Sequence, residues 1–263
     1  MIHSLAFIHP EAKIANNVKI DPFASISKNV EIGEGTWIGS NVTIMEGARI
    51  GKNCRIFPGA VISAIPQDLK FVGEETTAEI GDNTTIRECV TINRGTKARG
   101  KTSIGNDCLL MAYVHIAHDC EIRNNIIIGN SSQIAGEVII DNHAILSGSV
   151  LVHQFSRIGC HVMVSGGSLV RKDVPPFVMA AHEPLSYVGL NVVGLRRRQF
   201  SSEIIQQLAD SYKIIYSKNF NYTNALLEIE AKIPQSEERD EIINFVRNSK
   251  RGIMKGNTAM TTS

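Results

Sequence analysis

The sequence predicts a mainly β protein in which a long parallel β-solenoid precedes a smaller α-helical region. Aliphatic residues recur every six positions from Ile8 to Val170, and the sites at this spacing that break the rule are Asp68, Glu74 and Ala98. Small or β-branched residues stand two positions before most of these sites. After Val170 the period of six ends and apolar residues take helical spacing.

The six-residue period predicts a short strand and a sharp corner in each repeat. Side chains two residues apart point to the same face of a strand. Asn and Gly tolerate the left-handed backbone of a corner. Three residues after the first aliphatic sites stand Asn17, Phe23, Asn29, Gly35, Asn41, Gly47, Asn53 and Gly59. The pattern indicates a parallel β-solenoid, because a period of six does not keep one apolar stripe on a helix.

The period lapses over residues 63–79 and again over 97–103. We expect a loop that leaves the solenoid at each lapse, and loops on rigid scaffolds often carry function.

The chain changes character after the prolines of DVPPF, residues 173–177, which cannot continue a strand ladder. Helices are predicted over 203–217, 223–233 and 237–250, and a tail over 256–263. We therefore expect a β-solenoid domain at 1–186 and an α-helical domain at 187–263 that covers the open end of the solenoid.

Composition argues against several classes of function. Lys and Arg total 27 against 26 for Asp and Glu, so neither nucleic acid nor an anionic membrane is an expected partner. No stretch approaches the length of a membrane span and the N-terminus has no signal peptide, which predicts a cytoplasmic protein. The five cysteines lack paired spacing, and Cys54, Cys108 and Cys120 fall on core positions.

The repeat resembles the left-handed parallel β-helix of the hexapeptide acyltransferases, in which three repeats make one triangular coil of about 18 residues. The left hand is implied by this resemblance, since the general preference for right-handed crossovers would predict the opposite.

Residues three repeats apart then stack on successive coils, about 4.8 Å from one another. One such column holds His118, Gly136 and Gln154, and Asp119 stacks over Glu137 beside it. A histidine base with an acidic neighbour, a glycine N–H and an amide on one strip indicates acyl transfer. His115 and His153 adjoin this strip, whereas His143 and His161 are expected to be solvated side chains.

A zinc site is the main alternative for these histidines, as in the hexapeptide carbonic anhydrases. The pair His115 and His118 lacks a third histidine on the same strip, so we expect no metal site.

Six segments together resemble UDP-N-acetylglucosamine O-acyltransferases of the lipid A pathway. They are QDLKFVGE at 67–74, IRECVTINRGT at 86–96, HIAHDC at 115–120, VHQFSRIGCHVMV at 152–164, DVPPF at 173–177 and GLNVVGLRRR at 189–198. The resemblance implies transfer of a 3-hydroxyacyl chain from acyl carrier protein to the glucosamine 3-hydroxyl of UDP-N-acetylglucosamine. It also implies a homotrimer with active sites between subunits, and no cofactor other than the phosphopantetheine that the carrier brings.

The resemblance assigns roles to individual residues. His118 is the implied general base, oriented by Asp119, and the Gly136 N–H faces the oxyanion. Met163 and Gly166 are implied to limit acyl chain length. Substrate contacts are implied for Asp68, Lys70, His115, Glu137, His153, Gln154, Asn191, Arg197 and Arg198.

Two positions depart from the family pattern. Glu137 stands where many members carry histidine, and Val193 where an acidic residue often approaches the ribose. Candidate docking groups for the acidic carrier are Arg171, Lys172, Arg196, Arg197, Arg198, Lys250 and Arg251.

Three other functions remain open at this point. A coenzyme A acetyltransferase also fits a solenoid, although the loop at 67–74 and the helical region argue against it. An N-acyltransferase of the same pathway resembles a chain with an extra uridine-binding domain, for which a repeat starting at Ile8 leaves no room. A purely structural β-solenoid would not need the stacked His118, Gly136 and Gln154.

Overall fold

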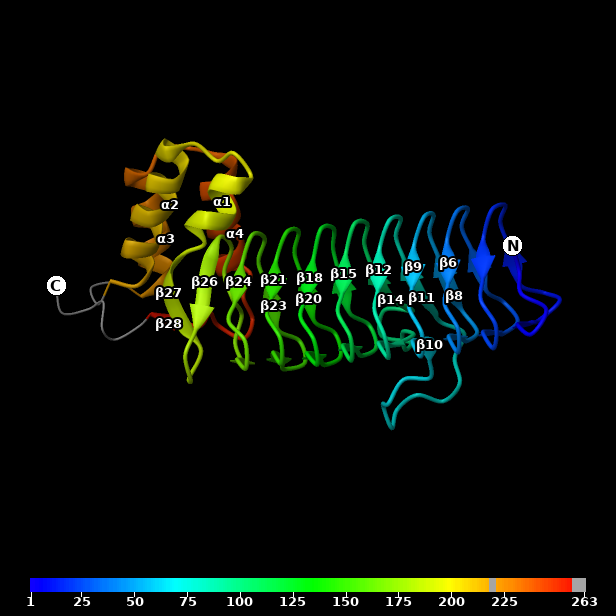
Figure 1. Cartoon of the computed structure of the whole chain (residues 1–263). Helices are drawn as coiled ribbons and strands as arrows, with labels where there is room; N and C mark the ends of the chain where they lie inside the picture. The colour runs from blue at the N-terminus through cyan, green and yellow to red at the C-terminus, as the bar shows by residue number, and fades with distance from the viewer. Residues whose placement is uncertain (218–220, 257–263) are drawn as a thin grey trace.

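The computed structural model describes residues 1–217 and 221–256. Successive short strands pass in turn through three sheets, so that each coil adds one strand to each face of a triangular prism (Figure 1). The expected left-handed parallel β-helix with a C-terminal helical region is confirmed.

Strands within the prism pair in parallel. The first sheet contains β1 (Phe7–Ile8), β4 (Ser25–Ile26), β7 (Thr43–Ile44), β10 (Val61–Ala64), β13 (Thr91–Asn93), β16 (His115–Ile116), β19 (Gln133–Ile134), β22 (Leu151–Val152) and β25 (Leu169–Val170). The second contains β2 (Lys13–Ile14), β5 (Glu31–Ile32), β8 (Ala48–Ile50), β11 (Thr77–Ile80), β14 (Lys101–Ile104), β17 (Glu121–Ile122), β20 (Ile139–Ile140) and β23 (Arg157–Ile158). The third begins with β3 (Lys19–Ile20), β6 (Trp37–Ile38), β9 (Arg55–Ile56), β12 (Thr85–Ile86), β15 (Leu109–Leu110), β18 (Ile127–Ile128), β21 (Ile145–Leu146) and β24 (Met163–Val164).

The register follows the three-repeat spacing. His115 pairs with Gln133, and Gln133 pairs with Leu151, each 18 residues further along the chain. The aliphatic sites point inward, and the side chains of Ile92, Ile116 and Ile134 are fully buried. The cysteines predicted for the core are buried there as well: Cys54, Cys108 and Cys120.

The corners take the left-handed backbone that the sequence predicts. Asn17, Asn29, Asn41 and Asn53 have φ between 52° and 58°. Phe23 adopts the same conformation at 63°, so position in the coil outweighs residue preference there.

Both predicted loops are present. Residues 65–76, between β10 and β11, project from the prism near β10 (Figure 1). Residues 94–100 form the second loop, between β13 and β14. These two segments are referred to below as the Asp68 loop (65–76) and the Thr96 loop (94–100).

The predicted helices correspond to α2 (Ser202–Ile215), α3 (Tyr222–Lys232) and α4 (Glu237–Arg247). Ser201, Asn221 and Ser236 cap their N-termini. The helices lie at the C-terminal end of the prism (Figure 1), where the Tyr212 hydroxyl donates to Pro176 O at 2.6 Å. No helix in residues 1–217 and 221–256 is long and apolar enough to cross a membrane.

Four elements at this end were not anticipated. A short helix, α1 (Val192–Arg197), follows the hairpin of β26 (Val178–Ala181) and β27 (Ser186–Leu190). After the prolines, β26 rejoins the third sheet beside β24, and β27 runs across the expected domain boundary at 186/187. The strand β28 (Lys255–Gly256) pairs with β27, and the rest of the expected tail, 257–263, lies outside the described residues.

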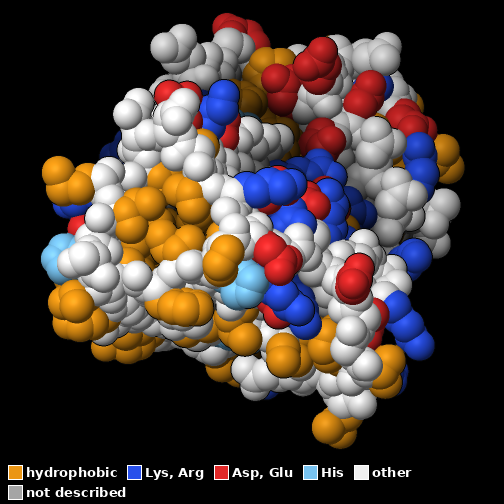
Figure 2. All heavy atoms as spheres, turned by 90° about the vertical axis from the view of Figure 1, so that its right-hand side faces the viewer, with side chains coloured by type: hydrophobic (Ala, Val, Ile, Leu, Met, Phe, Trp, Pro, Cys, Tyr) orange, Lys and Arg blue, Asp and Glu red, His pale blue; other side chains and the backbone are white. Residues whose placement is uncertain are grey.

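The N-terminal end of the prism carries apolar side chains at its surface, whereas the helices lie at the other end. Figure 2 views this N-terminal face, where hydrophobic side chains are exposed. Those at the first coil are Met1, Ile2, Leu5, Phe7 and Phe23.

Candidate active site

His118 lies at the corner between β16 and β17. Its neighbour Asp119 has left-handed backbone (φ 60°), and the carboxylate is fully buried. His118 Nδ1 is 2.8 Å from Asp119 Oδ2. A carboxylate accepts hydrogen bonds, so Nδ1 is the donor to Asp119, and in the neutral ring the lone pair of Nε2 then faces a substrate.

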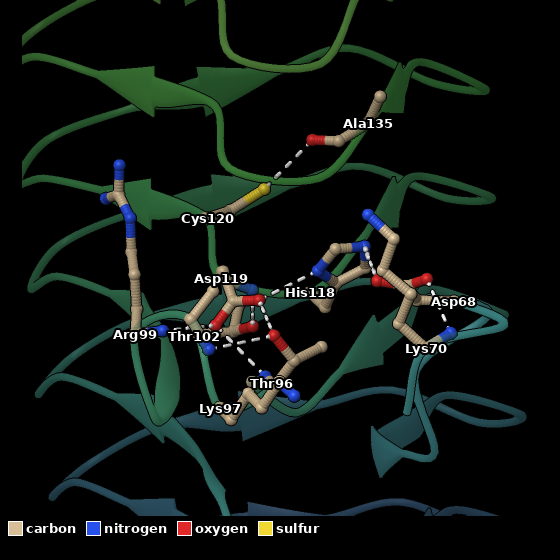
Figure 3. A network of polar contacts seen from close by, with 12 residues as sticks. Asp68, Lys70, Thr96, Lys97, Arg99, Thr102, His118, Asp119, Cys120 and Ala135 are labelled. Carbon is tan, nitrogen blue, oxygen red and sulfur yellow. Dashed lines mark hydrogen bonds and ion pairs between the residues drawn. The ribbon is translucent and has the colours of Figure 1, made fainter. Parts of the chain in front are cut away.

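The Thr96 loop holds the Asp119 carboxylate in place (Figure 3). Oδ1 accepts the backbone N–H groups of Thr96 at 3.0 Å and Arg99 at 3.2 Å. Oδ2 accepts the Thr96 hydroxyl at 2.7 Å, in addition to His118 Nδ1. These hydrogen bonds stabilise the buried Asp119 carboxylate, whose burial without partners would be costly.

The Asp68 loop approaches the opposite edge of the imidazole ring. Asp68 Oδ2 lies 4.0 Å from His118 Nε2, and Asp68 Oδ1 accepts the Lys70 backbone N–H at 2.9 Å. Figure 3 shows Asp68 and Lys70 on the side of the ring away from Asp119. Asp68 is therefore beside the base, and Lys70 follows it in the same loop.

Gly136 lies on the next coil, directly against the His118 ring. A Cβ at this position would meet His118 Cε1 and Nε2 at 2.7 Å, so only glycine fits beneath the imidazole. No acceptor among the described residues takes the Gly136 N–H, while its carbonyl accepts Phe155 N at 3.1 Å. The glycine thus has a free backbone donor next to the base, which suits stabilisation of an oxyanion.

The predicted column of stacked residues is present. Glu137 N donates to His118 O at 3.0 Å, which fixes the alignment of these two coils. His153 and Gln154 are exposed one coil further on, where His153 Nδ1 contacts Gln154 O at 3.0 Å.

His115 occupies the outward face of β16, three residues before His118. Its Nδ1 lies 2.7 Å from Thr91 Oγ1, and burial lowers the pKa of its imidazole below the ordinary value. The ring is therefore neutral near pH 7 and is oriented by Thr91.

Other predicted residues lie at a different corner of the same chain. Asn191 caps α1 by accepting Gly194 N at 3.1 Å, and its Nδ2 donates to His161 O at 3.0 Å. Arg197 and Arg198 follow at the end of α1. These contacts place α1 against the corner between β23 and β24, whereas His118 lies between the first and second sheets.

The two residues predicted to limit chain length lie on the third sheet and the corner that follows it. Met163 begins β24, and Gly166 is exposed just beyond this strand. One chain does not bring them beside His118. Val193, the second departure from the family pattern, is exposed on α1.

His143 and His161 were expected to be solvated, which is wrong for the His161 ring, whereas His143 is partly exposed and stacks on it. The two rings stack with their centroids 4.8 Å apart. The His161 centroid also lies 5.6 Å from that of Phe177 and 5.1 Å from that of Phe200. The Nδ1 atom of His161 is buried and has no hydrogen-bond partner among residues 1–217 and 221–256. Phe200, which follows α1, packs against His161. The six-residue period does not reveal this contact.

Thr96 and Glu74 are site residues that sequence reasoning did not single out. Thr96 is the last residue of IRECVTINRGT, immediately before the period lapses, and Glu74 replaces an aliphatic residue inside the first lapse. The lapses were therefore the available signal. Within residues 1–217 and 221–256, no group of three or more His, Cys, Asp or Glu side chains could hold a metal ion.

Two family models match the chain. The bacterial transferase hexapeptide model matches residues 29–64 and 101–136. The model described as domain 2 of UDP N-acetylglucosamine O-acyltransferase matches residues 173–254, which include the helices.

Whole-chain relatives agree with these matches. A protein of Myxococcus xanthus named acyl-(acyl-carrier-protein)–UDP-N-acetylglucosamine O-acyltransferase is 43% identical over 255 residues, covering 97% of this chain and 99% of the relative. One of the same name from Chlorobaculum parvum is 53% identical over 193 residues, 73% of each protein. The crystal structure of a UDP-N-acetylglucosamine acyltransferase from Bacteroides fragilis is 56% identical with a TM-score of 0.96, covering 97% of this chain and 100% of that one. The chain belongs to the UDP-N-acetylglucosamine O-acyltransferase family.

Proposed function

We propose that the protein transfers a 3-hydroxyacyl group from acyl carrier protein to the glucosamine 3-hydroxyl of UDP-N-acetylglucosamine, the first step of lipid A biosynthesis. The names of its relatives supply the donor and the acceptor. The observation that carries the proposal is the His118 imidazole, whose Nδ1 is held by Asp119 while Nε2 lies against Gly136.

The reaction proceeds by direct attack, without a covalent enzyme intermediate. His118 Nε2 removes the proton from the sugar 3-hydroxyl as the oxygen attacks the thioester carbonyl. The Gly136 N–H donates to the oxyanion that forms. Collapse of the intermediate breaks the carbon–sulfur bond, and the imidazolium returns its proton to the leaving thiolate of phosphopantetheine. A positioned base of this kind contributes about 10²- to 10⁴-fold to the rate.

The surrounding residues bind the substrates. Asp68 and Lys70 contact the glucosamine and the acyl donor, and His115 contacts the nucleotide phosphates. The residues proposed to complete these contacts are Glu137, His153, Gln154, Asn191, Arg197 and Arg198. Phosphopantetheine enters with the carrier, and the proposed reaction uses no other cofactor.

The separation of α1 from His118 within one chain supports a homotrimer. Flat faces of a triangular prism pack around a threefold axis, and the His118 strip of one subunit would then face α1 of its neighbour. Sedimentation equilibrium should give three times the chain mass, and a fully active monomer would contradict the assembly. We further propose that the enzyme works in the cytoplasm, where carrier-bound acyl chains are made.

Mass spectrometry tests the reaction directly. The protein is incubated with UDP-N-acetylglucosamine and a mixture of 3-hydroxyacyl thioesters of acyl carrier protein, and the acylated sugar nucleotide is identified and fragmented. An ester at the glucosamine 3-oxygen supports the proposal. An acetylated product that forms only with acetyl coenzyme A would instead support the acetyltransferase alternative.

A further inference from the structure

The two loops that leave the prism meet at the same imidazole. The Thr96 loop contacts Asp119 on the Nδ1 side of His118, and the Asp68 loop faces Nε2 (Figure 3). Neither loop obeys the six-residue period, so their conformations are set by contacts and not by the coil.

Thr96 contributes two hydrogen bonds to the buried carboxylate. Its hydroxyl donates to Asp119 Oδ2 at 2.7 Å, the same oxygen that accepts His118 Nδ1 at 2.8 Å. Its backbone N–H donates to Asp119 Oδ1 at 3.0 Å. Thr96 is itself buried, with 6% of its surface exposed, so water does not readily replace the hydroxyl.

Asp119 Oδ2 accepts both the Thr96 hydroxyl and His118 Nδ1, so the Thr96 contact does more than hold the loop in place. Backbone N–H groups hold Oδ1, and the hydroxyl holds Oδ2, so together they fix the plane of the carboxylate. Loss of the hydroxyl leaves Oδ2 bound by the imidazole alone. The carboxylate can then rotate about its remaining bonds, and the ring that it orients moves with it.

Glu74 joins the Thr96 loop to the Asp68 loop. Its Oε1 accepts Lys97 N at 3.0 Å, and its Oε2 accepts Val72 N at 2.9 Å, so one carboxylate bonds backbone in both loops. Hydrogen bonds from its own backbone N–H and from Val72 lower the pKa of Glu74 below its ordinary value. The groups on both sides of His118 are therefore connected.

We propose that Thr96 is a positioning residue for the reaction: its hydroxyl fixes the Asp119 carboxylate and through it the orientation of His118. Glu74 extends this control to the loop that carries Asp68. The inference rests on the proposed role of His118 as the general base. It predicts an effect on turnover, because Thr96 contacts Asp119 and not the substrate.

The test compares Thr96→Val, which removes the hydroxyl at nearly constant size, with Thr96→Ser, which keeps it. We expect Thr96→Val to lower kcat about 10-fold or more at nearly unchanged KM for UDP-N-acetylglucosamine, and Thr96→Ser to restore most of the loss. Thr96→Ala also removes the hydroxyl, and its side chain is smaller than valine. If Thr96→Val does not assemble, the same loss of kcat is expected in Thr96→Ala. Turnover of both hydroxyl-free variants within twofold of wild type would overturn the proposal.

Thr84→Val provides the matched control. The Thr84 hydroxyl is also buried and donates to Gly105 O at 2.8 Å, but this residue lies just before β12, away from the site. We expect this variant to lose thermal stability without losing kcat. An equal loss of kcat in Thr84→Val would show that any buried threonine has this effect, and would overturn the proposal.

A double-mutant cycle shows whether Thr96 acts through Asp119. In the Asp119→Asn background, Thr96→Val should cause little further loss, whereas multiplied losses would mean an independent action and would reject the inference. His118→Ala is measured beside them. If that variant stays active, the proposed base is wrong. If it is inactive while Thr96→Val matches wild type, the base stands and the role of Thr96 falls.

Discussion

The His118 imidazole lies so close to Gly136 that a methyl group on Gly136 would approach both Cε1 and Nε2 to 2.7 Å. The glycine therefore serves the site in two ways: it offers an N–H group and it leaves space for the base. A side chain at position 136 would therefore displace the base.

Gly136→Ala should therefore reduce turnover, by about 10²-fold or more, although the backbone N–H remains. The added methyl pushes the ring away from Asp119 and from the substrate hydroxyl. Steady-state kinetics check the loss, and a crystal structure of the variant should show a rotated imidazole. Gly148→Ala is the control, because its Cβ would meet Asn130 O at 3.4 Å, an ordinary contact. A fully active Gly136→Ala enzyme would contradict the tight packing.

His118→Ala should abolish transfer and leave assembly and sugar-nucleotide binding nearly intact. The side chain lies outside the core and acts on the reacting proton, so the loss appears in turnover and not in affinity. Asp119→Asn should also lower the rate, because an amide no longer orients the ring as the carboxylate does. The hypothesis would be falsified if His118→Ala kept more than about a tenth of wild-type turnover.

His115→Ala should weaken nucleotide binding, because the proposed role of this ring is contact with phosphate. We expect KM for UDP-N-acetylglucosamine to rise about 10-fold with a smaller change in kcat. Thr91→Val, which removes the partner of His115 Nδ1, should show the same trend more weakly. Isothermal titration with UDP measures the affinity directly, and equal UDP affinity in His115→Ala and wild type would rule out the contact.

Gly166→Met should shift the product towards shorter acyl chains. Glycine has no side chain to block the end of the acyl chain, so we expect the wild-type enzyme to prefer a long 3-hydroxyacyl chain. A Cβ at Gly166 would lie 3.2 Å from Gly148 O, so a side chain fits after a small adjustment and extends outward. Mass spectrometry of the products formed from a mixture of acyl thioesters measures the preferred acyl chain length. An unchanged chain-length profile would remove Gly166 from this role.

Stability should fall as the pH drops below the ordinary range of histidine, because His161 is held neutral. Burial, with His143 and Arg198 nearby, lowers the pKa of His161 from 6.5 to about 4. The unfolded chain thus binds this proton at a higher pH than the folded chain does. The contribution of this neutral ring to stability is fully present above about pH 6.5 and is lost as the pH falls towards 4.

Thermal melting at pH 7.5 and pH 5 measures this loss. His161→Phe keeps the stacked contact with Phe177 and the edge contact with Phe200 and removes the titrating group, so its melting temperature should depend less on pH. His182→Asn, at an exposed position, is the control and should behave as wild type. Equal pH dependence in wild type and His161→Phe would assign the acid sensitivity to other groups.

The prism could be predicted from sequence because a coil repeats one local rule. An aliphatic residue every six positions specifies which side chains enter the core, and Asn or Gly three residues later marks most corners of the first coils. His118, Gly136 and Gln154 follow from the same rule, since three repeats bring them onto neighbouring coils. The family resemblance supplied the left hand and the roles, which periodicity does not contain.

The rest depended on contacts between segments distant in the sequence. Where the period lapses, no local pattern specifies how the Asp68 loop and the Thr96 loop fold. Only the structure shows that Asp68 approaches His118 Nε2 and that Thr96 hydrogen-bonds Asp119. The short helix α1 forms after a hairpin and is capped by Asn191, whose amide also bonds His161 O across 30 residues. The sequence by itself determined the coil and the column of site residues, because these repeat a local pattern. How the base is oriented became visible only in the tertiary structure, because that orientation rests on hydrogen bonds between Asp119 and a loop about 20 residues away in the sequence.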